Sequence, residues 1–189
     1  EWWNGFSAVL NLCEEADRTY LHSRLQYLMD TYGVDGFKFD GGNITGFKKS
    51  AWVTEPPVQT AEELNRAWNE FGEAYAYHEY KDTYHRGGKA TIQRICDRGH
   101  EWGKNGLGSL IPFALAQGIL GYPYLCPDMI GGGSWAPTVD PNFKCDEELF
   151  VRMAQCSALF PMMQFSWAPW EALNQDNLNI TIESAKLHD

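Results

Sequence analysis

The sequence contains no apolar run long enough to cross a bilayer as a helix, and none of its five cysteines lies in a CxxC or other zinc-type spacing. An odd number of cysteines predicts mostly free, buried thiols and no disulfide framework. Basic residues are also scarce: 15 Lys and Arg face 25 Asp and Glu, which gives a formal net charge of −10. The chain therefore has no predicted membrane segment, and nucleic acid is not expected among its partners.

The residues that are present indicate a globular protein. Of the 189 residues, 44% are hydrophobic and 21% are charged, so the chain can bury a sizeable core, and a single domain over residues 1–189 is expected. The eight tryptophans fit either a core or the apolar faces of sugar rings. Because the first residue is Glu1 and not Met, we expect the chain to be part of a longer protein.

Predicted strands and helices alternate along the chain, which is typical of a parallel sheet covered by helices. About four strands are visible, whereas a closed (β/α)8 barrel has eight. We therefore predict an α/β fold, an incomplete (β/α)8 TIM barrel that comprises roughly the C-terminal half to two-thirds of such a domain. A small doubly wound sheet is the alternative. The predicted helices are 14–31, 61–77, 105–120, 146–160 and 169–186, and the predicted strands are 36–40, 90–95, 123–126 and 161–165.

The most informative segment is the run from Tyr32 to Gly41, which predicts a helix end, a loop, a short strand and a Gly-rich turn. Lys38 and Asp40 are two residues apart, so both side chains project from the same face of the strand, at its C-terminal end. In a β/α barrel this is the end that carries the chemistry. An Asp beside a fixed cation stays ionised and is ready to act as a nucleophile; otherwise Asp40 only caps the next turn.

Two further acidic residues, Asp97 and Asp128, follow predicted strands in the same way. Carboxylates at neighbouring strand ends converge on one pocket, and glycoside hydrolysis needs such a pair, one as nucleophile and one as acid and base. Each Asp alone could equally be a turn residue. Between them, Arg94 leaves a strand next to Asp97, and Trp102 either lines a pocket or covers the barrel rim.

Several longer motifs carry a resemblance to a known family. The chain resembles glycoside hydrolase family 31, and within it the α-galactosidase-like branch that contains the myogenesis-regulating glycosidases. The resemblance runs nearly end to end. It rests on the segments 2–5, 32–41, 97–103, 109–112, 120–123, 127–132, 163–166 and 169–170.

The resemblance implies a role for each matched position. Asp40 is similar to the catalytic nucleophile of the family, Asp97 to its acid/base and Asp128 to a third acidic residue near the sugar. Trp3 is similar to the aromatic wall of the sugar subsite, and Lys38 to a lysine near the sugar hydroxyls. The resemblance implies no metal or cofactor. Its Lys-x-Asp order favours galactose over glucose.

Two positions depart from the common family pattern. Ser166 stands where typical α-glucosidases of the family carry a His, which agrees with the galactosidase-like branch. Lys81 falls where an Arg usually contacts the sugar, and Lys is not a faithful substitute for a bidentate guanidinium. The first barrel strands of the family lie upstream of Trp3, so we expect this chain alone to lack a complete pocket.

Three hypotheses follow from the sequence. The first is a retaining α-glycosidase, an α-galactosidase or else an α-glucosidase, whose partner is a carbohydrate such as an α-galactoside. The second is a Mg²⁺-dependent barrel enzyme of the enolase type, in which Asp40, Asp97 and Asp128 hold the metal and Lys38 is the base. The third is a protein that binds sugar without turnover.

Overall fold

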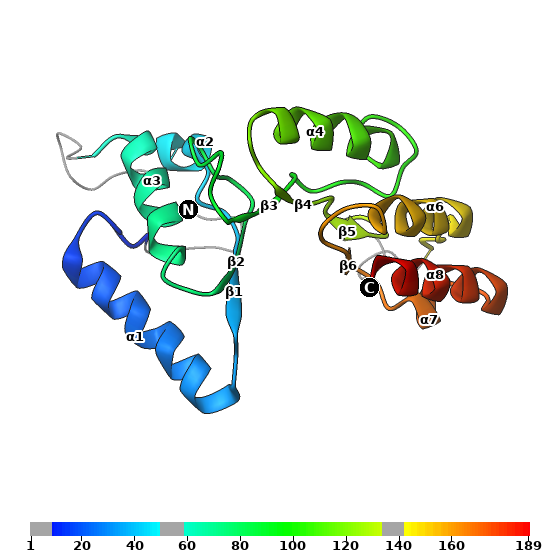
Figure 1. Ribbon diagram of the computed structural model, residues 1–189, viewed down its shortest axis with the longest axis horizontal. Helices are drawn as coiled ribbons and strands as arrows, with labels where there is room; N and C mark the ends of the chain where they lie inside the picture. Colours follow the sequence, from blue (N-terminus) through cyan, green and yellow to red (C-terminus); the bar gives the residue numbers. More distant parts are fainter. Residues whose placement is uncertain (1–8, 50–58, 134–141) are drawn as a thin grey trace. The chain divides into compact units, whose positions relative to one another are not determined.

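The computed structural model describes residues 9–49, 59–133 and 142–189, in two compact units, Glu1–Gly87 (unit 1) and Gly88–Asp189 (unit 2) (Figure 1). Each unit contains helices and a pair or pairs of parallel strands, so the predicted α/β class is confirmed. The expectation of one domain over residues 1–189 stays a prediction.

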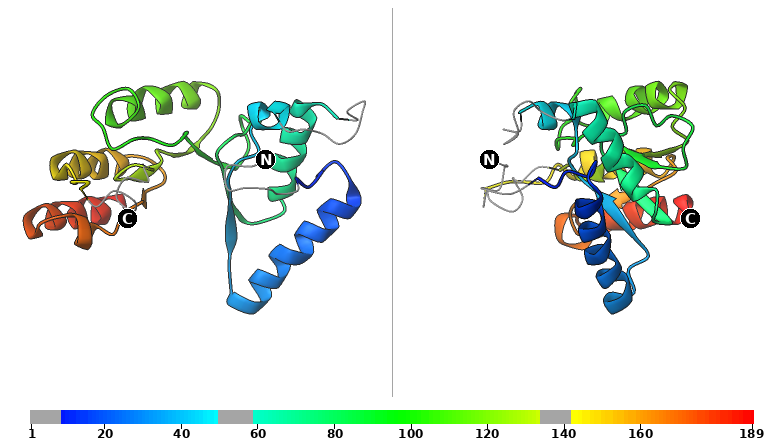
Figure 2. Two further views of the ribbon diagram at one scale, coloured as in Figure 1. Left: turned by 180° about the vertical axis from the view of Figure 1, so that it is seen from behind. Right: turned by 90° about the vertical axis from the view of Figure 1, so that its left-hand side faces the viewer.

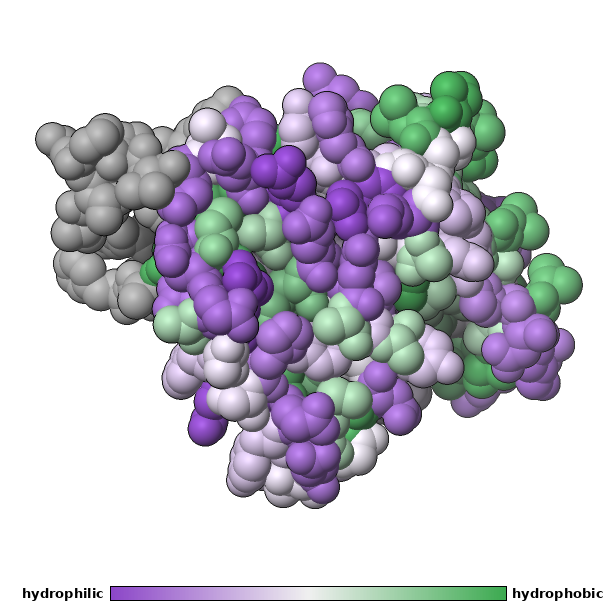
Figure 3. Space-filling view, turned by 60° about the vertical axis from the view of Figure 1, so that its left-hand side comes forward, coloured by the Kyte–Doolittle hydropathy of each residue, from purple (hydrophilic) through white to green (hydrophobic). Residues whose placement is uncertain are grey.

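Unit 1 begins with helix α1 (Glu15–Tyr32), which agrees with the predicted helix. The helix ends at Gly33, whose φ of 66° lies in the left-handed region and whose amide donates to the Met29 carbonyl at 3.0 Å, as the sequence predicts for a C-cap. Leu21, Leu25 and Met29 pack towards the core, whereas Leu28 is exposed. Figure 3 shows that the face bearing α1 is mostly hydrophilic, in keeping with a helix that has no fully buried side chain.

Helix α3 (Ala61–Gly72) starts with a capping box, because Thr60 accepts from the Glu63 amide while the Glu63 carboxylate accepts from the Thr60 amide. The predicted helix over 61–77 is too long: the chain turns after Gly72 and forms strand β2 (Tyr77–Tyr80), which the sequence analysis missed. A short helix, α2 (Ile44–Lys49), follows the predicted Gly-rich turn.

Strand β1 (Gly36–Phe39) pairs with β2 in parallel, with Phe39 opposite Tyr80. The rings of Phe39 and Tyr80 stack at 4.9 Å between centroids. Both α1 and α3 cover this aromatic face of the strand pair (Figures 1 and 2), where the core of unit 1 lies. Because successive residues of a strand point to opposite faces, Lys38 and Asp40 point away from the helices.

Unit 2 holds two parallel strand pairs. Strand β3 (Ile92–Arg94) pairs with β4 (Tyr124–Cys126), and β5 (Met129–Ile130) pairs with β6 (Gln164–Phe165). The strands predicted over 90–95, 123–126 and 161–165 are therefore confirmed in shorter form. Strand β5, only two residues long, was missed.

The helices of unit 2 are α4 (Leu107–Ile119), α6 (Glu147–Ser157), α7 (Pro169–Ala172) and α8 (Gln175–His188). The predicted final helix over 169–186 is two helices, because Asn174 caps α8 by accepting from the Asn177 amide at 3.0 Å. The core of the unit lies between β5 and α6, and its buried side chains are Ile130, Leu149, Phe150, Met153 and Ala154.

Helix α4 does not bury a single apolar stripe. Leu110 is buried, whereas Ile111 and Leu115 are exposed by 56% and 64%. Because α4 is apolar all round, its periodicity does not single out one face. Its exposed apolar side chains, with the residue that caps it, are Ile111, Phe113, Leu115, Ile119 and Leu120.

All five cysteines are free thiols, but only Cys126 is fully buried, and Cys96 is exposed. No helix within the described parts of the chain is both long and apolar enough to span a membrane.

Candidate active site

Four charged residues lie on the face of β1 and β2 that the helices leave uncovered. Lys38 and Glu79 occupy paired positions in the register, and Asp40 and Lys81 each follow the last paired position, Phe39 and Tyr80. Lys38 Nζ lies 3.8 Å from Glu79 Oε1, and Lys81 Nζ lies 3.7 Å from Asp40 Oδ1. We call these four residues the strand-end quartet.

Asp40, the predicted nucleophile, is the most accessible acid of the quartet. Its side chain is 63% exposed, whereas that of Glu79 is 11% exposed. The Lys81 ammonium forms an ion pair with this exposed carboxylate. The site prediction for Lys81 came from its family position alone; the structure places it at the end of the missed strand β2.

Glu79 is a candidate site residue that sequence reasoning missed. The signal was present, since His78-Glu-Tyr-Lys81 alternates aromatic and charged residues in the same way as Phe37-Lys-Phe-Asp40. Strand β2 is only four residues long, and the predicted helix over 61–77 included its first residue, Tyr77.

In unit 2 the structure brings Arg94, Asp97 and Asp128 together. Arg94 Nη1 donates to Asp97 Oδ1 at 2.9 Å and to Asp128 Oδ1 at 2.6 Å. The Arg94 side chain is only 2% exposed and that of Asp128 is fully buried, whereas the Asp97 side chain is 51% exposed. The Asp97 side chain is therefore half exposed, whereas its partner Arg94 is buried.

The surroundings of this trio favour the charged form of Arg94 but not that of Asp128. Burial opposes the charge of Arg94, but its hydrogen bond to Asp97 and the charge of Asp128 outweigh this effect, so the pKa of Arg94 is raised. Burial raises the pKa of Asp128, while the Arg98 amide and Arg94 act in the opposite direction. The Arg98 amide donates to Asp128 Oδ2 at 2.6 Å. Asp128 therefore binds both the Arg94 side chain and the backbone of Arg98, the residue after Asp97.

Asp128 has an unusual backbone conformation, with a φ of 73°. Asp and Asn tolerate this left-handed region better than most residues. The turn directs the carboxylate back towards Arg94, which explains why a strand-end Asp is buried here and not exposed like Asp40.

Trp102 lies in the loop that follows Asp97 and is half exposed. Its Nε1 donates to Asp146 Oδ2 at 2.8 Å, and Asp146 also caps α6 by accepting from the Leu149 amide. The Asp146 amide donates to His100 Nε2 at 2.9 Å, while His100 Nδ1 lies 3.1 Å from the Gly131 carbonyl. His100 and Asp146 therefore fix the loop that carries Asp97 and Trp102.

His100 fits this place as a neutral imidazole. With Nε2 accepting from an amide, the proton is on Nδ1, which faces the Gly131 carbonyl. Burial lowers the pKa of His100, opposed by the Gly131 carbonyl and the charge of Asp146. The ring also packs against Trp167, with centroids 4.9 Å apart, so its role is structural.

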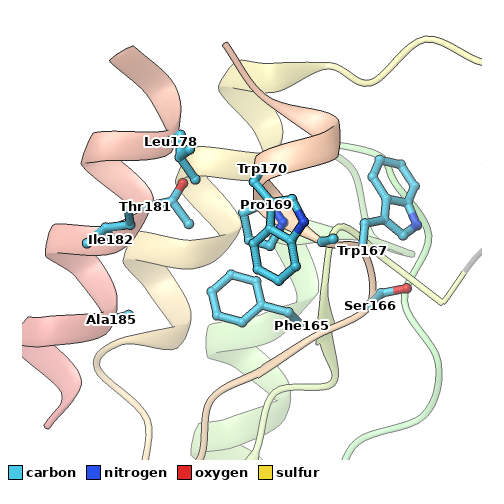
Figure 4. Close-up of a pocket in the computed structure, with 10 residues that line it drawn as sticks. Phe165, Ser166, Trp167, Pro169, Trp170, Leu178, Thr181, Ile182 and Ala185 are labelled. Atoms are coloured by element: carbon cyan, nitrogen blue, oxygen red, sulfur yellow. The ribbon is translucent and has the colours of Figure 1, made fainter. Parts of the chain in front are cut away.

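Ser166 follows β6, and its amide donates to the Ile130 carbonyl at 3.0 Å. It borders an open apolar pocket of about 710 Å³ that β6, α7 and α8 form, lined mainly by Phe165, Trp170, Leu178 and Ile182. Figure 4 shows the Ser166 hydroxyl directed away from the α8 side of this pocket. Trp3, the remaining predicted site residue, lies outside the described residues.

A metal ion does not suit the unit 2 carboxylates. The Arg94 guanidinium already lies between Asp97 and Asp128 and supplies the positive charge there. Across the described ranges no group of three or more His, Cys, Asp or Glu side chains is arranged to hold a metal.

No family model matches the chain. The myogenesis-regulating glycosidase of Mus musculus is 33% identical over 175 residues, which cover 90% of this chain and 24% of the mouse protein. The chain is a homologue of a glycosidase. This confirms the resemblance to glycosidases of the family 31 type that its motifs indicated.

This glycosidase homologue also matches the isomaltosyltransferase of Sporosarcina globispora, at 27% identity over 86% of the chain and 15% of the relative. It thus spans about a quarter of the length of the first relative and less than a sixth of the second. Among solved structures, the uncharacterised protein lmo2446 of Listeria monocytogenes EGD-e superposes with a TM-score of 0.68 at 18% identity, over 97% of this chain and 18% of that one. This likeness shows a shared fold.

Proposed function

We propose that the protein is a retaining α-glycosidase, with α-galactosides as substrates, built on part of a (β/α)8 barrel. One observation carries the proposal: Asp40 lies at the carboxyl end of β1, exposed and beside Lys81, on the face that the helices leave open. In β/α barrels the catalytic residues lie at this end of the strands. The homology to a glycosidase over 90% of the chain supports the same assignment.

In the proposed reaction, Asp40 attacks the anomeric carbon and forms a glycosyl ester while Asp97 gives its proton to the departing oxygen. Asp97 then takes a proton from water, whose oxygen attacks the anomeric carbon and releases Asp40. Arg94 and Asp128 hold Asp97 from below. Lys38 lies where it would bind sugar hydroxyls, and Trp3, Lys81, Trp102 and Ser166 are the further proposed sugar contacts.

Galactose is favoured by two features of the chain. The Lys-x-Asp order puts Lys38 and Asp40 on the same face of β1. Ser166 stands where typical α-glucosidases of the family carry a histidine. Because the chain spans about a quarter of its glycosidase relative, the activity is proposed for the longest natural form of the protein.

The experiment is hydrolysis of an aryl α-galactoside by that form of the protein. We expect Asp40→Asn to lower kcat by at least about a thousandfold, because loss of a covalent nucleophile removes a large part of the acceleration. Asp35→Asn is the matched control, since Asp35 is an exposed acid at the other end of the same strand. The nucleophile assignment is wrong if Asp40→Asn keeps the rate within about tenfold of the unaltered protein.

Retention is tested in the same assay by NMR. The first-formed galactose should be the α anomer, because two displacements restore the starting configuration. If β-galactose forms first, the reaction inverts the configuration, and Asp40 would act as a general base that activates water and not as the nucleophile.

A second candidate is an α-glucoside-acting enzyme, either a hydrolase or a transferase. The isomaltosyltransferase relative favours it, because the match covers 86% of the chain. The structure of lmo2446 has also been described in complex with α- and β-D-glucose, magnesium and calcium. An aryl α-glucoside assayed beside the galactoside, with and without a glucose acceptor, decides between the two sugars and between hydrolysis and transfer.

A further inference from the structure

We propose that Asn65 and Asp82 are positioning residues that fix the loop directly after Asp40. The inference rests on the proposed role of Asp40 as nucleophile. Neither residue belongs to the strand-end quartet, and neither is expected to touch the sugar. They act through the backbone on which Asp40 is carried.

Asn65 comes from the buried face of α3 and is fully buried itself. Its Nδ2 donates to the Gly42 carbonyl at 2.8 Å and to Asp82 Oδ1 at 3.2 Å. A buried asparagine of this kind is costly unless its polar atoms are satisfied, and here its two hydrogens bind the loop after Asp40 and the residue after Lys81. One side chain thus ties together the ends of β1 and β2.

Asp82 extends this link to the next turn. Its carboxylate accepts hydrogen bonds from the backbone amides of Ile44 and Tyr84 in addition to Asn65. Ile44 is the first residue of α2, so the carboxylate holds the start of that helix. Because Asp82 directly follows Lys81, it also fixes the backbone of Lys81, whose ammonium lies beside Asp40.

Gly42 completes the arrangement by close packing. Its φ is 70°, and a Cβ at this position would come within 2.2 Å of Trp68 Cδ1 on α3. The loop therefore packs against α3 at Gly42, where Asn65 also binds the Gly42 carbonyl. We call Asn65, Asp82 and the Gly42–Trp68 contact the loop clamp.

The loop clamp leaves Asp40 little freedom. On its N-terminal side, Phe39 is held in register opposite Tyr80; on its C-terminal side, Gly42 is clamped two residues away. A nucleophile displaced by about 1 Å from its line of attack loses on the order of a hundredfold in rate. Loss of the clamp should therefore lower the rate of attack and leave sugar binding nearly unchanged.

The test uses a 5-fluoro-α-galactosyl fluoride, whose fluoride leaves as Asp40 attacks and whose ester then hydrolyses slowly. Covalent labelling is followed by the mass of the intact protein, in its longest natural form, and the labelled residue is mapped by peptide mass. Asn65→Leu removes the hydrogen bonds and keeps the side-chain size. We expect its labelling rate constant to fall by about a hundredfold, with the half-saturating reagent concentration changed by less than about threefold.

Asn69→Leu is the matched control. Asn69 is almost as buried on the same helix and donates to the Asn65 and Asp82 backbone carbonyls and to Asn65 Oδ1, but it makes no bond to residues 41–44. We expect its labelling rate to stay within about threefold of the unaltered protein, with a comparable loss of thermal stability. Equal losses of rate in both variants, or an Asn65→Leu rate within about threefold of the unaltered protein, would overturn the proposal.

Asp82→Asn is the second variant if Asn65→Leu fails to fold. It keeps the shape of the side chain and weakens the acceptor for Ile44 and Tyr84, and we expect a labelling rate about tenfold lower. An unchanged rate in Asp82→Asn would also refute the clamp. If the unaltered protein is not labelled at Asp40 at all, the glycosidase proposal itself fails, and the inference falls with it.

Discussion

The two units each present an acidic residue beyond the end of a parallel strand, but they hold it in different ways. In unit 1, Asp40 is accompanied by a lysine at 3.7 Å and is fixed through the backbone of the following loop. In unit 2, Asp97 is held directly by Arg94 at 2.9 Å, and Arg94 is itself held by the buried Asp128.

The ion pair of Asp40 and the ion pair of Asp128 are expected to contribute differently to stability. A flexible ammonium that pairs with an exposed carboxylate contributes little to folding, so Lys81 and Asp40 are free to serve chemistry. A buried guanidinium must be neutralised for the unit to fold at all, so Arg94 and Asp128 are part of the structure that supports Asp97. Mutation of Asp40 is therefore expected to affect activity, whereas mutation of Asp128 is expected to affect stability.

The largest stability effect is expected for Asp128→Asn. Asn tolerates the left-handed backbone at this position, so the variant tests the charge and not the turn. Without the carboxylate, Arg94 is left with one exposed partner, and we expect the free energy of unfolding to fall by about 3 kcal/mol, measured by urea denaturation.

Asp97→Asn is the matched variant, because it removes the other carboxylate from the same arginine. Its side chain is half exposed, so we expect a loss below about 1 kcal/mol together with a large loss of activity. A greater loss of stability for Asp97→Asn than for Asp128→Asn would contradict the division of roles.

An intermediate effect is expected for Lys81→Met, in activity and not in stability. We expect kcat/KM to fall by about tenfold, because Asp40 loses its neighbouring cation, while the free energy of unfolding changes by less than about 1 kcal/mol. Lys81→Arg keeps the charge and should retain most of the activity. If both variants unfold as readily as Asp128→Asn, the ion pair of unit 1 is structural after all.

The smallest effect concerns pH. The pKa of His100 is lowered by burial from its usual 6.5, so the unfolded chain binds a proton at higher pH than the folded chain does. The stabilisation is therefore complete above pH 6.5 and is lost as the pH falls through the lower, folded pKa. Thermal midpoints measured between pH 7.5 and 5 should decline less in His100→Gln than in the unaltered protein.

His85→Asn is the control for that series. His85 is exposed in unit 1 and has a φ of 57°, which Asn tolerates. The variant should keep the pH response of the unaltered protein. If the pH response vanishes in His85→Asn and persists in His100→Gln, it belongs to unit 1 and the prediction for His100 is wrong.

The sequence predicted the elements whose signals are local. Gly33 ends α1 as expected, the alternation of Phe37 and Phe39 with Lys38 and Asp40 separates the core face from the charged face, and most strands and helices lie where periodicity placed them. These features depend on residues a few positions apart, so a single sequence is sufficient.

Features set by tertiary contacts were missed. Strand β2 is four residues long and exists through its pairing with β1, and β5 has two residues that pair with β6. Arg94 and Asp128 are 34 positions apart, so their contact at 2.6 Å could not be derived from spacing. The roles of Asn65 and Asp82 depend on hydrogen bonds between a helix and two loops, which no local pattern encodes.

Helix α4 carries a practical consequence. The helix exposes four large apolar side chains, Ile111, Phe113, Leu115 and Ile119. The net charge of −10 otherwise favours solubility. We expect the protein to self-associate through these side chains as its concentration rises, and mild detergent or dilution should reverse the association. Kinetic work on this protein is best begun in dilute solution, with light scattering recorded beside every rate.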